Sequence, residues 1–125
     1  MNLNQVTLPS TNLEASVAFY TTLGFNLIVD ALPRYARFEC IDGEATFSIH
    51  YVETIQQGNS IVIYFEDKNI DYTVKKLQEK GIEFTTLPQD QSWLWREATL
   101  VDPDGNNIIL YYAGKNRKNP PWRIN

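Results

Sequence analysis

Histidine and cysteine, two side chains that commonly bind transition metals, are scarce in this sequence. His50 is its only histidine and Cys40 its only cysteine. An imidazole titrates near neutral pH, so His50 could transfer a proton or contact a ligand, and a hydrogen-bonded structural histidine is the alternative. Ser48 has no base and acid beside it in the sequence pattern, so we do not expect a nucleophilic serine. Cys40 lies in an apolar run and is expected to be a small buried residue.

Charged and aromatic side chains are the other candidates for contacts to a ligand. We interpret Arg37 and Glu39 as a charge pair, with direct ligand contacts as the alternative. Trp93 and Trp95 are two residues apart, and on a strand such side chains point the same way. They predict a flat aromatic surface that suits either stacking on a planar ligand or a dimer interface.

Two segments have the pattern of amphipathic helices. A possible capping box, Thr11 to Glu14, opens the first, and Gly24 ends it. The second begins near Ile70, and Gly81 closes it. Apolar residues recur at helical spacing in both. Gly24 and Gly81 are 57 residues apart, and apolar positions before and after them align at the same offset, which indicates an internal repeat.

Alternating residues predict four strands in each half of the chain. The expected strands are 5–8, 25–27, 35–41 and 46–52, then 62–65, 82–84, 95–101 and 108–112. Each half is therefore a βαβββ module, and the fold class is α+β. A helix covers one face of such a sheet, and we expect the open faces of two modules to form a cleft for a small molecule.

We expect one domain over residues 1–125, with module one at 1–55, module two at 59–113 and a C-terminal tail at 114–125. Residues 56–59 are interpreted as the linker between the modules. Trp122 of the tail is expected to pack on the domain or on a neighbouring subunit. Alternation along the strands gives the candidate ligand-binding residues. They are Gln5, Arg37, Glu39, Ser48, His50, Tyr64, Trp93, Trp95, Glu97 and Tyr111.

Charge and composition restrict the partners. The formal net charge is −4, which argues against nucleic acid or an anionic membrane as a partner and favours a neutral or cationic ligand. The N-terminal residues do not resemble a secretory leader, and no apolar run approaches membrane length. A single cysteine cannot form an internal disulfide and is typical of a reducing compartment. We therefore expect a cytoplasmic protein.

The segment Leu100–Tyr111 has the pattern strand, tight turn, strand. Pro103 fixes φ at one corner of the turn, and Gly105 can adopt a positive φ. With this hairpin after two strand-helix modules, the chain resembles the vicinal oxygen chelate superfamily, which includes glyoxalases, extradiol dioxygenases and bleomycin and fosfomycin resistance proteins. The resemblance implies two tandem βαβββ modules that form a curved mixed sheet around an open cleft.

Metal-dependent glyoxalases of this superfamily hold a divalent ion at four positions. The resemblance carries these positions onto Gln5, Val62, Ile109 and either Ser48 or His50. Val62 and Ile109 have no donor atom, so we expect no metal cofactor. The alternative is a divalent metal such as nickel or zinc, bound by Gln5 and His50 together with groups of a second chain.

The expected function is that of a homodimeric small-molecule-binding protein that resembles the bleomycin resistance branch. It would hold a planar or cationic ligand in an aromatic cleft, without a catalytic metal. The alternative is a metal-dependent lyase or isomerase of the lactoylglutathione lyase (glyoxalase I) type, with a degenerate or dimer-shared metal site. The sequence does not identify the ligand.

Overall fold

A computed structural model describes residues 1–56 and 61–124, which belong to two compact units. Unit 1 is Met1–Asn59 with the turn Asp102–Asn106, and unit 2 is Ser60–Val101 with Asn107–Asn125. The turn thus groups with unit 1, although the strands on either side of it belong to unit 2. Most of the predicted linker, from residue 57 on, lies outside the described residues. That the chain is a single domain stays a prediction.

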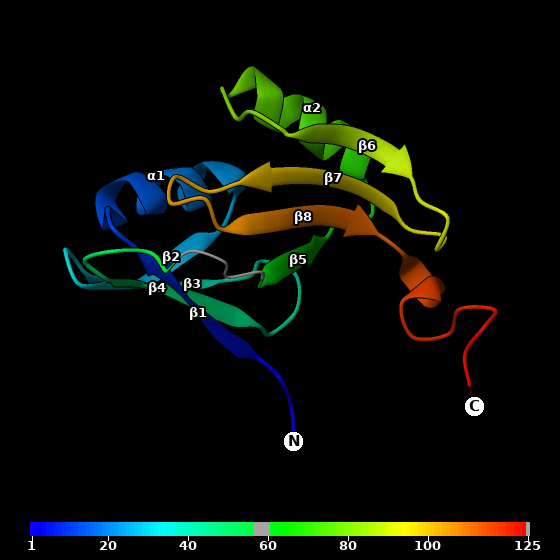
Figure 1. Cartoon of the computed structure of the whole chain (residues 1–125), viewed down its shortest axis with the longest axis horizontal. Coiled ribbons are helices and arrows are strands. Elements are labelled where there is room, and N and C mark those ends of the chain that lie inside the picture. The colour runs from blue at the N-terminus through cyan, green and yellow to red at the C-terminus, as the bar shows by residue number, and fades with distance from the viewer. Residues whose placement is uncertain (57–60, 125) are drawn as a thin grey trace. The chain divides into compact units, whose positions relative to one another are not determined.

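Unit 1 consists of one helix and a four-stranded mixed sheet (Figure 1). Its elements are β1 (Gln5–Ser10), α1 (Leu13–Leu23), β2 (Asn26–Ala31), β3 (Tyr35–Glu39) and β4 (Thr46–Tyr51). The strand order is β1-β4-β3-β2, with β1 parallel to β4 and the other pairs antiparallel. This arrangement confirms the predicted βαβββ module. Cys40, expected to be buried, lies just after β3 and is only partly buried.

Both ends of α1 are fixed by local hydrogen bonds. Gly24 ends the helix in the left-handed conformation with φ 108°, as the sequence predicts. The predicted capping box is wrong, because Asn12 is the N-cap residue and its side chain accepts a hydrogen bond from the Ala15 backbone at 3.1 Å. Thr11 lies one residue earlier and donates to Asp104 instead.

The face of the sheet toward α1 carries an aromatic core. Tyr20, Phe38 and Phe47 are at most 1 % exposed. The ring centroids of Phe38 and Phe47 are 5.1 Å apart, and those of Tyr20 and Phe47 are 5.0 Å apart. Leu8 and Ile49 are register partners and extend this core along β1 and β4. Alternation along the strands then sends the intervening residues to the opposite face, which we call the open face of unit 1.

The turn at Asp102 supplies unit 1 with a buried carboxylate. Asp102 is 3 % exposed and accepts a hydrogen bond of 2.7 Å from the Tyr20 hydroxyl. It also accepts from the backbone N–H groups of Asp104 and Asn106, both at 2.9 Å, and from the Asn106 side chain at 2.8 Å. Burial, and then the charge of Asp102, raise the pKa of Tyr20 far above its usual range, so the phenol stays a donor.

Asp104 in the same turn binds the segment that leads into α1. Its carboxylate accepts from the Thr11 backbone N–H at 2.7 Å, from the Thr11 hydroxyl at 2.6 Å and from the Ser16 hydroxyl at 3.1 Å. A carboxylate at this place satisfies groups at the beginning of the helix and interacts favourably with its dipole. The turn thereby fixes the start of α1.

Unit 2 repeats the architecture of unit 1. Its elements are β5 (Val62–Glu66), α2 (Ile70–Glu79), β6 (Thr86–Asp90), β7 (Arg96–Val101), β8 (Asn107–Tyr112) and the short 3₁₀ helix η1 (Gly114–Asn116). The strand order is β5-β8-β7-β6, with β5 parallel to β8. The corresponding order in the two sheets confirms the internal repeat. The fold is α+β, with two mixed four-stranded sheets and two helices, as predicted.

The predicted strand at 82–84 is wrong. After α2 the backbone N–H of Ile82 bonds to the Leu77 carbonyl at 3.0 Å, which continues the helix end. The first bond to β7 comes from the Thr85 N–H to the Thr99 carbonyl at 2.8 Å. The chain therefore meets the sheet only several residues after Gly81, and β6 begins at Thr86.

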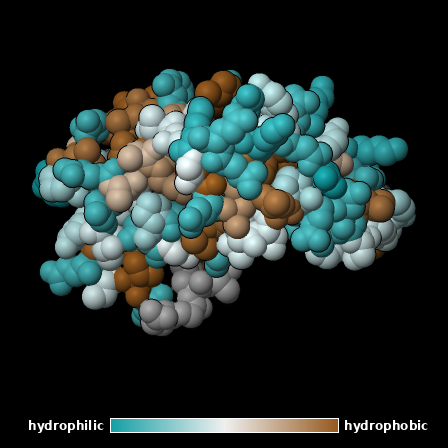
Figure 2. Space-filling view, turned by 90° about the horizontal axis from the view of Figure 1, so that it is seen from above, coloured by the Kyte–Doolittle hydropathy of each residue, from teal (hydrophilic) through white to brown (hydrophobic). Residues whose placement is uncertain are grey.

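The described residues include no helix that is long and apolar enough to cross a membrane. Figure 2 shows hydrophilic side chains spread among hydrophobic ones over the face drawn there. Exposed apolar residues scattered among polar ones are common on globular proteins and need no special explanation.

We expect Tyr20→Phe to lower the free energy of unfolding by about 1–3 kcal/mol, because buried Asp102 loses one of its donors. Urea denaturation of the full chain measures this change. Tyr51→Phe is the matched control, because Tyr51 lies in the same sheet but is 49 % exposed. Equal effects of the two variants would contradict the role given to the Tyr20–Asp102 hydrogen bond.

Asp104 should make the stability of unit 1 depend on pH. Partial burial alone would raise the pKa of this carboxyl, but its hydrogen bonds from Ser10, Thr11 and Ser16 outweigh burial and lower it. The stabilisation is therefore complete above the unfolded-state pKa and is lost as the pH falls through the folded-state pKa.

We expect Asp104→Ala to cost on the order of 1–2 kcal/mol at neutral pH, since charged hydrogen bonds are lost. The difference from the wild type should shrink on acidification. Urea midpoints of both proteins across the acid range measure it, and a constant difference at every pH would contradict the assignment.

Candidate functional site

The strand registers place a set of polar residues on the open face of unit 1. Thr7 pairs with Ser48, Ser48 pairs with Arg37, and His50 pairs with Tyr35. This orientation agrees with the alternation in the sequence. The predicted ligand-binding residues on this face are Gln5, Arg37, Glu39, Ser48 and His50. Their part in ligand binding stays a prediction.

Ser48 is the most buried member of this set. It is 0 % exposed. The Gln5 side-chain amide donates to its hydroxyl at 2.9 Å, and the Thr7 hydroxyl lies 2.8 Å from it. Gln5 is itself oriented by two further bonds, one to the Val6 carbonyl at 3.1 Å and one from the Thr46 hydroxyl. The amide and the hydroxyls therefore form one connected network on β1 and β4.

The predicted charge pair between Arg37 and Glu39 is wrong. Arg37 Nε donates to the Tyr35 hydroxyl at 2.8 Å, and the guanidinium carbon lies 5.4 Å from the centre of the Tyr35 ring. Glu39 accepts from the Asn26 side chain of β2 at 2.8 Å. Asn26 and Glu39 are direct register partners on neighbouring strands. Arg37 and Glu39 lie two residues apart on the same strand, so they are farther from each other along the sheet.

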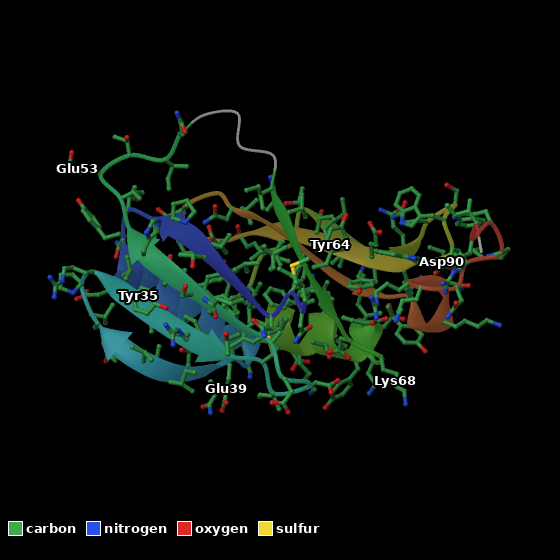
Figure 3. The ribbon with its side chains drawn as sticks, turned by 90° about the horizontal axis from the view of Figure 1, so that it is seen from below. Tyr35, Glu39, Glu53, Tyr64, Lys68 and Asp90 are labelled. Atoms are coloured by element: carbon green, nitrogen blue, oxygen red, sulfur yellow. The ribbon has the colours of Figure 1, made fainter. Side chains whose placement is uncertain are left out.

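Tyr35 shares this face with Arg37 and Glu39, as the alternation along the strand predicts, and Figure 3 shows it on β3. Partial burial alone would raise the pKa of its hydroxyl. Its hydrogen bonds to Ser48 and Arg37, and the positive charge of Arg37, outweigh that effect and lower the pKa. His50 is exposed beside Tyr35, and no hydrogen bond to its imidazole occurs among the described residues.

The open face of unit 2, opposite α2, is aromatic where that of unit 1 is polar. Tyr64, Trp95 and Tyr111 form a cluster there, which we call the aromatic cluster (Tyr64 in Figure 3). Trp95 and Tyr111 are stacked with ring centroids 4.7 Å apart, and Tyr64 stands at 89° to both rings, 5.9 Å and 5.6 Å away. Tyr111 is 6 % exposed and Tyr64 is 47 % exposed, so the cluster has a buried base and an accessible edge.

Trp93 and Trp95 do not form the predicted flat surface. Trp93 lies in a turn between β6 and β7, in which the Leu94 N–H bonds to the Gln91 carbonyl at 3.0 Å and Leu94 has φ 67°. The left-handed residue between the tryptophans breaks the strand alternation on which the prediction depended. The Trp93 indole instead donates to Glu97, a buried carboxylate, at 2.7 Å.

Glu66 is a residue of this face that the sequence interpretation missed. It pairs with Tyr111, and its carboxylate accepts from the backbone N–H groups of Ala113 and Gly114, both at 2.9 Å. Burial, and then the nearby charge of Glu66, raise the pKa of the Tyr111 hydroxyl. Glu66 comes two residues after Tyr64 on β5, and residues at this spacing share a face, so the sequence pattern could have identified it.

The C-terminal tail begins beside the same cluster. The Trp95 indole donates to the Asn116 carbonyl at 3.4 Å, and the Asn119 N–H bonds to the Lys115 carbonyl at 2.7 Å. Trp122 is 56 % exposed in the single chain, so the expectation that it packs on the domain is not met. Its packing on a neighbouring subunit stays a prediction.

The residues at the four superfamily metal positions do not fit a divalent ion within one chain. The equivalent registers of the two sheets make Ser48, and not His50, the counterpart of Ile109. Val62 and Ile109 have no donor atom, and the Gln5 amide is taken up by its neighbours. Among the described residues, no group of three or more His, Cys, Asp or Glu side chains could hold a metal.

The fold defines a class of protein with two βαβββ modules, each with a helix on one face of its sheet and an open face on the other. The family model of the glyoxalase/bleomycin resistance protein/dioxygenase superfamily matches residues 2–110. The chain therefore belongs to this superfamily, as the sequence pattern indicated.

A relative described as an uncharacterised protein of Mycolicibacterium smegmatis is 27 % identical over 110 residues, which are 87 % of this chain and 91 % of the relative. The crystal structure of a glyoxalase/bleomycin resistance protein/dioxygenase from Nocardioides is 24 % identical with a TM-score of 0.78, over 100 % of this chain and 90 % of that one.

Two further solved structures are of proteins whose names state what they bind or catalyse. A bleomycin-binding protein complexed with bleomycin has a TM-score of 0.74 at 20 % identity, over 90 % of this chain and 98 % of that one. A lactoylglutathione lyase from Agrobacterium tumefaciens has a TM-score of 0.73 at 16 % identity, over 94 % of this chain and 96 % of that one. At these identities the likeness shows the shared fold.

The residues at the four superfamily metal positions lead to a prediction about metal content. Protein purified without chelator should contain substoichiometric nickel and zinc by elemental analysis, and titration with either ion should show no saturable site. The double variant Val62→His/Ile109→Glu is a positive control, because it places two metal ligands on the open face of unit 2. Near-stoichiometric metal in the wild type would contradict the prediction and indicate a site shared between chains.

Proposed function

We propose that this member of the superfamily binds a planar or cationic small molecule and does so without a catalytic metal. The aromatic cluster is the observation that carries the proposal. Tyr64 is 47 % exposed and Trp95 is partly exposed, so these two rings are accessible to a ligand, while the buried Tyr111 supports Trp95 by stacking on it. Ring faces attract planar groups by stacking and cations by their quadrupole.

The charges around the cluster favour a cation over an anion. Glu66 pairs with Tyr111 across β5 and β8, and Glu97 pairs with Tyr111 across β7 and β8. Two carboxylates therefore lie beside one face of rings. The chain as a whole has a formal net charge of −4, which adds a long-range attraction for cations.

Sequestration of an antibiotic is the specific form that we propose. The similar fold of a protein that was crystallised with bleomycin supports it, and makes bleomycin the first ligand to test. We propose that Trp93 and Glu97 border the aromatic cluster of unit 2, and that Gln5, Arg37, Glu39, Ser48 and His50 provide polar ligand contacts on the open face of unit 1. We further propose a cytoplasmic homodimer.

Trp95→Leu should weaken ligand binding at least tenfold, about 1.4 kcal/mol, because it removes the ring that stacks on Tyr111. Bleomycin and acridine orange, a planar cation, are the probes, and isothermal titration calorimetry gives the dissociation constants. Tyr64→Leu should weaken binding to a smaller extent, since only the accessible edge is lost.

Trp122→Phe is the matched control, because Trp122 lies in the exposed part of the tail. It should leave both dissociation constants unchanged while circular dichroism confirms that all variants are folded. If neither probe binds the wild type, or if Trp95→Leu binds as the wild type does, the proposed function is wrong.

A metal-dependent lyase is the second candidate. The similar fold of a lactoylglutathione lyase favours it, and Gln5 is a possible metal ligand on the first strand. The hydrocarbon side chains of Val62 and Ile109 argue against it. The metal titration described above separates the two candidates, since only the lyase needs a saturable metal site.

A further inference from the structure

Glu97 on β7 is a nearly buried carboxylate that receives few hydrogen bonds. It is 6 % exposed, and among the described residues the only donor to its side chain is the Trp93 indole, 2.7 Å from Oε2. Asp102, which is buried to a similar degree, receives four donors. A carboxylate removed from water is costly unless several hydrogen bonds or a cation compensate it. Glu97 therefore has capacity for a further donor.

The second oxygen of this carboxylate, Oε1, is accessible from outside the chain. No hydrogen bond to Oε1 occurs among the described residues. In the partly and fully buried residues of the same ranges, every completely covered side-chain oxygen has a hydrogen-bond partner, so Oε1 retains contact with solvent. The described lysines and arginines make no ion pair with Glu97, Arg117 near Tyr111 included. A charged donor from a ligand can therefore reach Oε1.

The turn before β7 holds the Trp93 indole on Glu97. Leu94 adopts φ 67° between the two tryptophans, a conformation that is unfavourable for a bulky residue. The backbone hydrogen bond from Leu94 to Gln91, at 3.0 Å, stabilises this turn. Strained conformations of this kind concentrate where a site needs a fixed geometry. Because the indole occupies Oε2, the carboxylate is held in one orientation and Oε1 is left for a ligand.

Glu97 also lies beside the rings of the aromatic cluster. It is the register partner of Tyr111 on β8, so the two side chains share the open face of unit 2. Trp95 stacks on Tyr111 at 4.7 Å and is partly exposed. Glu66 flanks Tyr111 on the other side, but it is exposed, and water weakens the attraction between an exposed carboxylate and a cation. Glu97 is thus the stronger partner for a cation on this face.

We propose that Glu97 determines the ligand class of this site by selecting a cation that carries an N–H group, namely a protonated amine or amidine. The planar part of such a ligand lies against Trp95, and its N–H group donates a charge-assisted hydrogen bond to Oε1 of Glu97. A quaternary ammonium ion has the charge without the N–H, and a neutral amide has the N–H without the charge, so both bind less tightly. This inference rests on the proposed function, because it specifies the ligand of the same site.

Three small aromatic probes separate the effect of charge from that of hydrogen bonding. Benzamidine is a planar cation with N–H groups, benzamide is its neutral counterpart, and phenyltrimethylammonium is a cation without an N–H group. We expect the wild type to bind benzamidine about tenfold more tightly than either of the others, or about 1.4 kcal/mol. Isothermal titration calorimetry measures the three dissociation constants. This comparison needs no variant, so it decides the proposal even if a substitution of Glu97 prevents folding.

Glu97→Gln should abolish the preference for benzamidine over benzamide, because the new amide keeps the shape and an acceptor for Trp93 but has no charge. Asp90→Asn is the matched control. It removes the same charge from the same sheet, at a side chain that is 84 % exposed and paired with Arg96. This control should retain the preference, and circular dichroism checks that both variants are folded.

The outcomes distinguish this inference from the proposed function. If bleomycin or acridine orange binds the wild type but benzamidine shows no preference, or if Glu97→Gln retains the preference, the inference is overturned and the proposed function stands. Loss of the preference in Asp90→Asn as well would show that net charge causes it, and would also overturn the role of Glu97. If none of these probes binds the wild type, both proposals are wrong.

Discussion

The buried carboxylate of Asp102 is the interaction on which the arrangement of unit 1 depends. A charge removed from water costs several kcal/mol unless hydrogen bonds compensate it, and Asp102 receives four donors. Three of them shape its own turn, and the fourth is the hydroxyl of Tyr20, 82 positions earlier in the chain. Tyr20 is therefore held at the centre of the aromatic core, and α1 is fixed on one face of its sheet. The open face is defined as a consequence.

The two modules share one architecture and differ in the chemistry of their open faces. Equivalent positions of the two sheets hold Ser48 and Ile109, and Thr7 and Tyr64. The first module thus has a network of hydroxyl and amide groups, whereas the second has stacked rings with carboxylates beside them. A repeat fixes the backbone and leaves the outward residues free to vary, because the core needs only the inward ones. This divergence leaves two of the four superfamily metal positions, Val62 and Ile109, without a side-chain donor atom for a metal.

Alternation along the strands predicted which residues share a face, and it failed where the backbone leaves the strand. The registers of β1, β3 and β4 agree with it, since the pleat fixes the side of every second residue. Trp93 was misplaced because Leu94 adopts a left-handed conformation that no local signal announced. Arg37 and Glu39 were paired with each other because the sequence does not show that β2 brings Asn26 to Glu39.

The sequence by itself determined the family, the two modules and, along the regular strands, which alternate residues share an open face. Periodicity and the turn at Gly105 are local properties, and local sterics impose them wherever the chain goes. Only the tertiary structure decided the partners of the polar groups. That Asp102 accepts from Tyr20, and that Glu66 binds the backbone after β8, depend on contacts between segments distant in sequence. Such pairs form because buried polar groups must be satisfied, and many arrangements could satisfy them until the packing of the whole unit selects one.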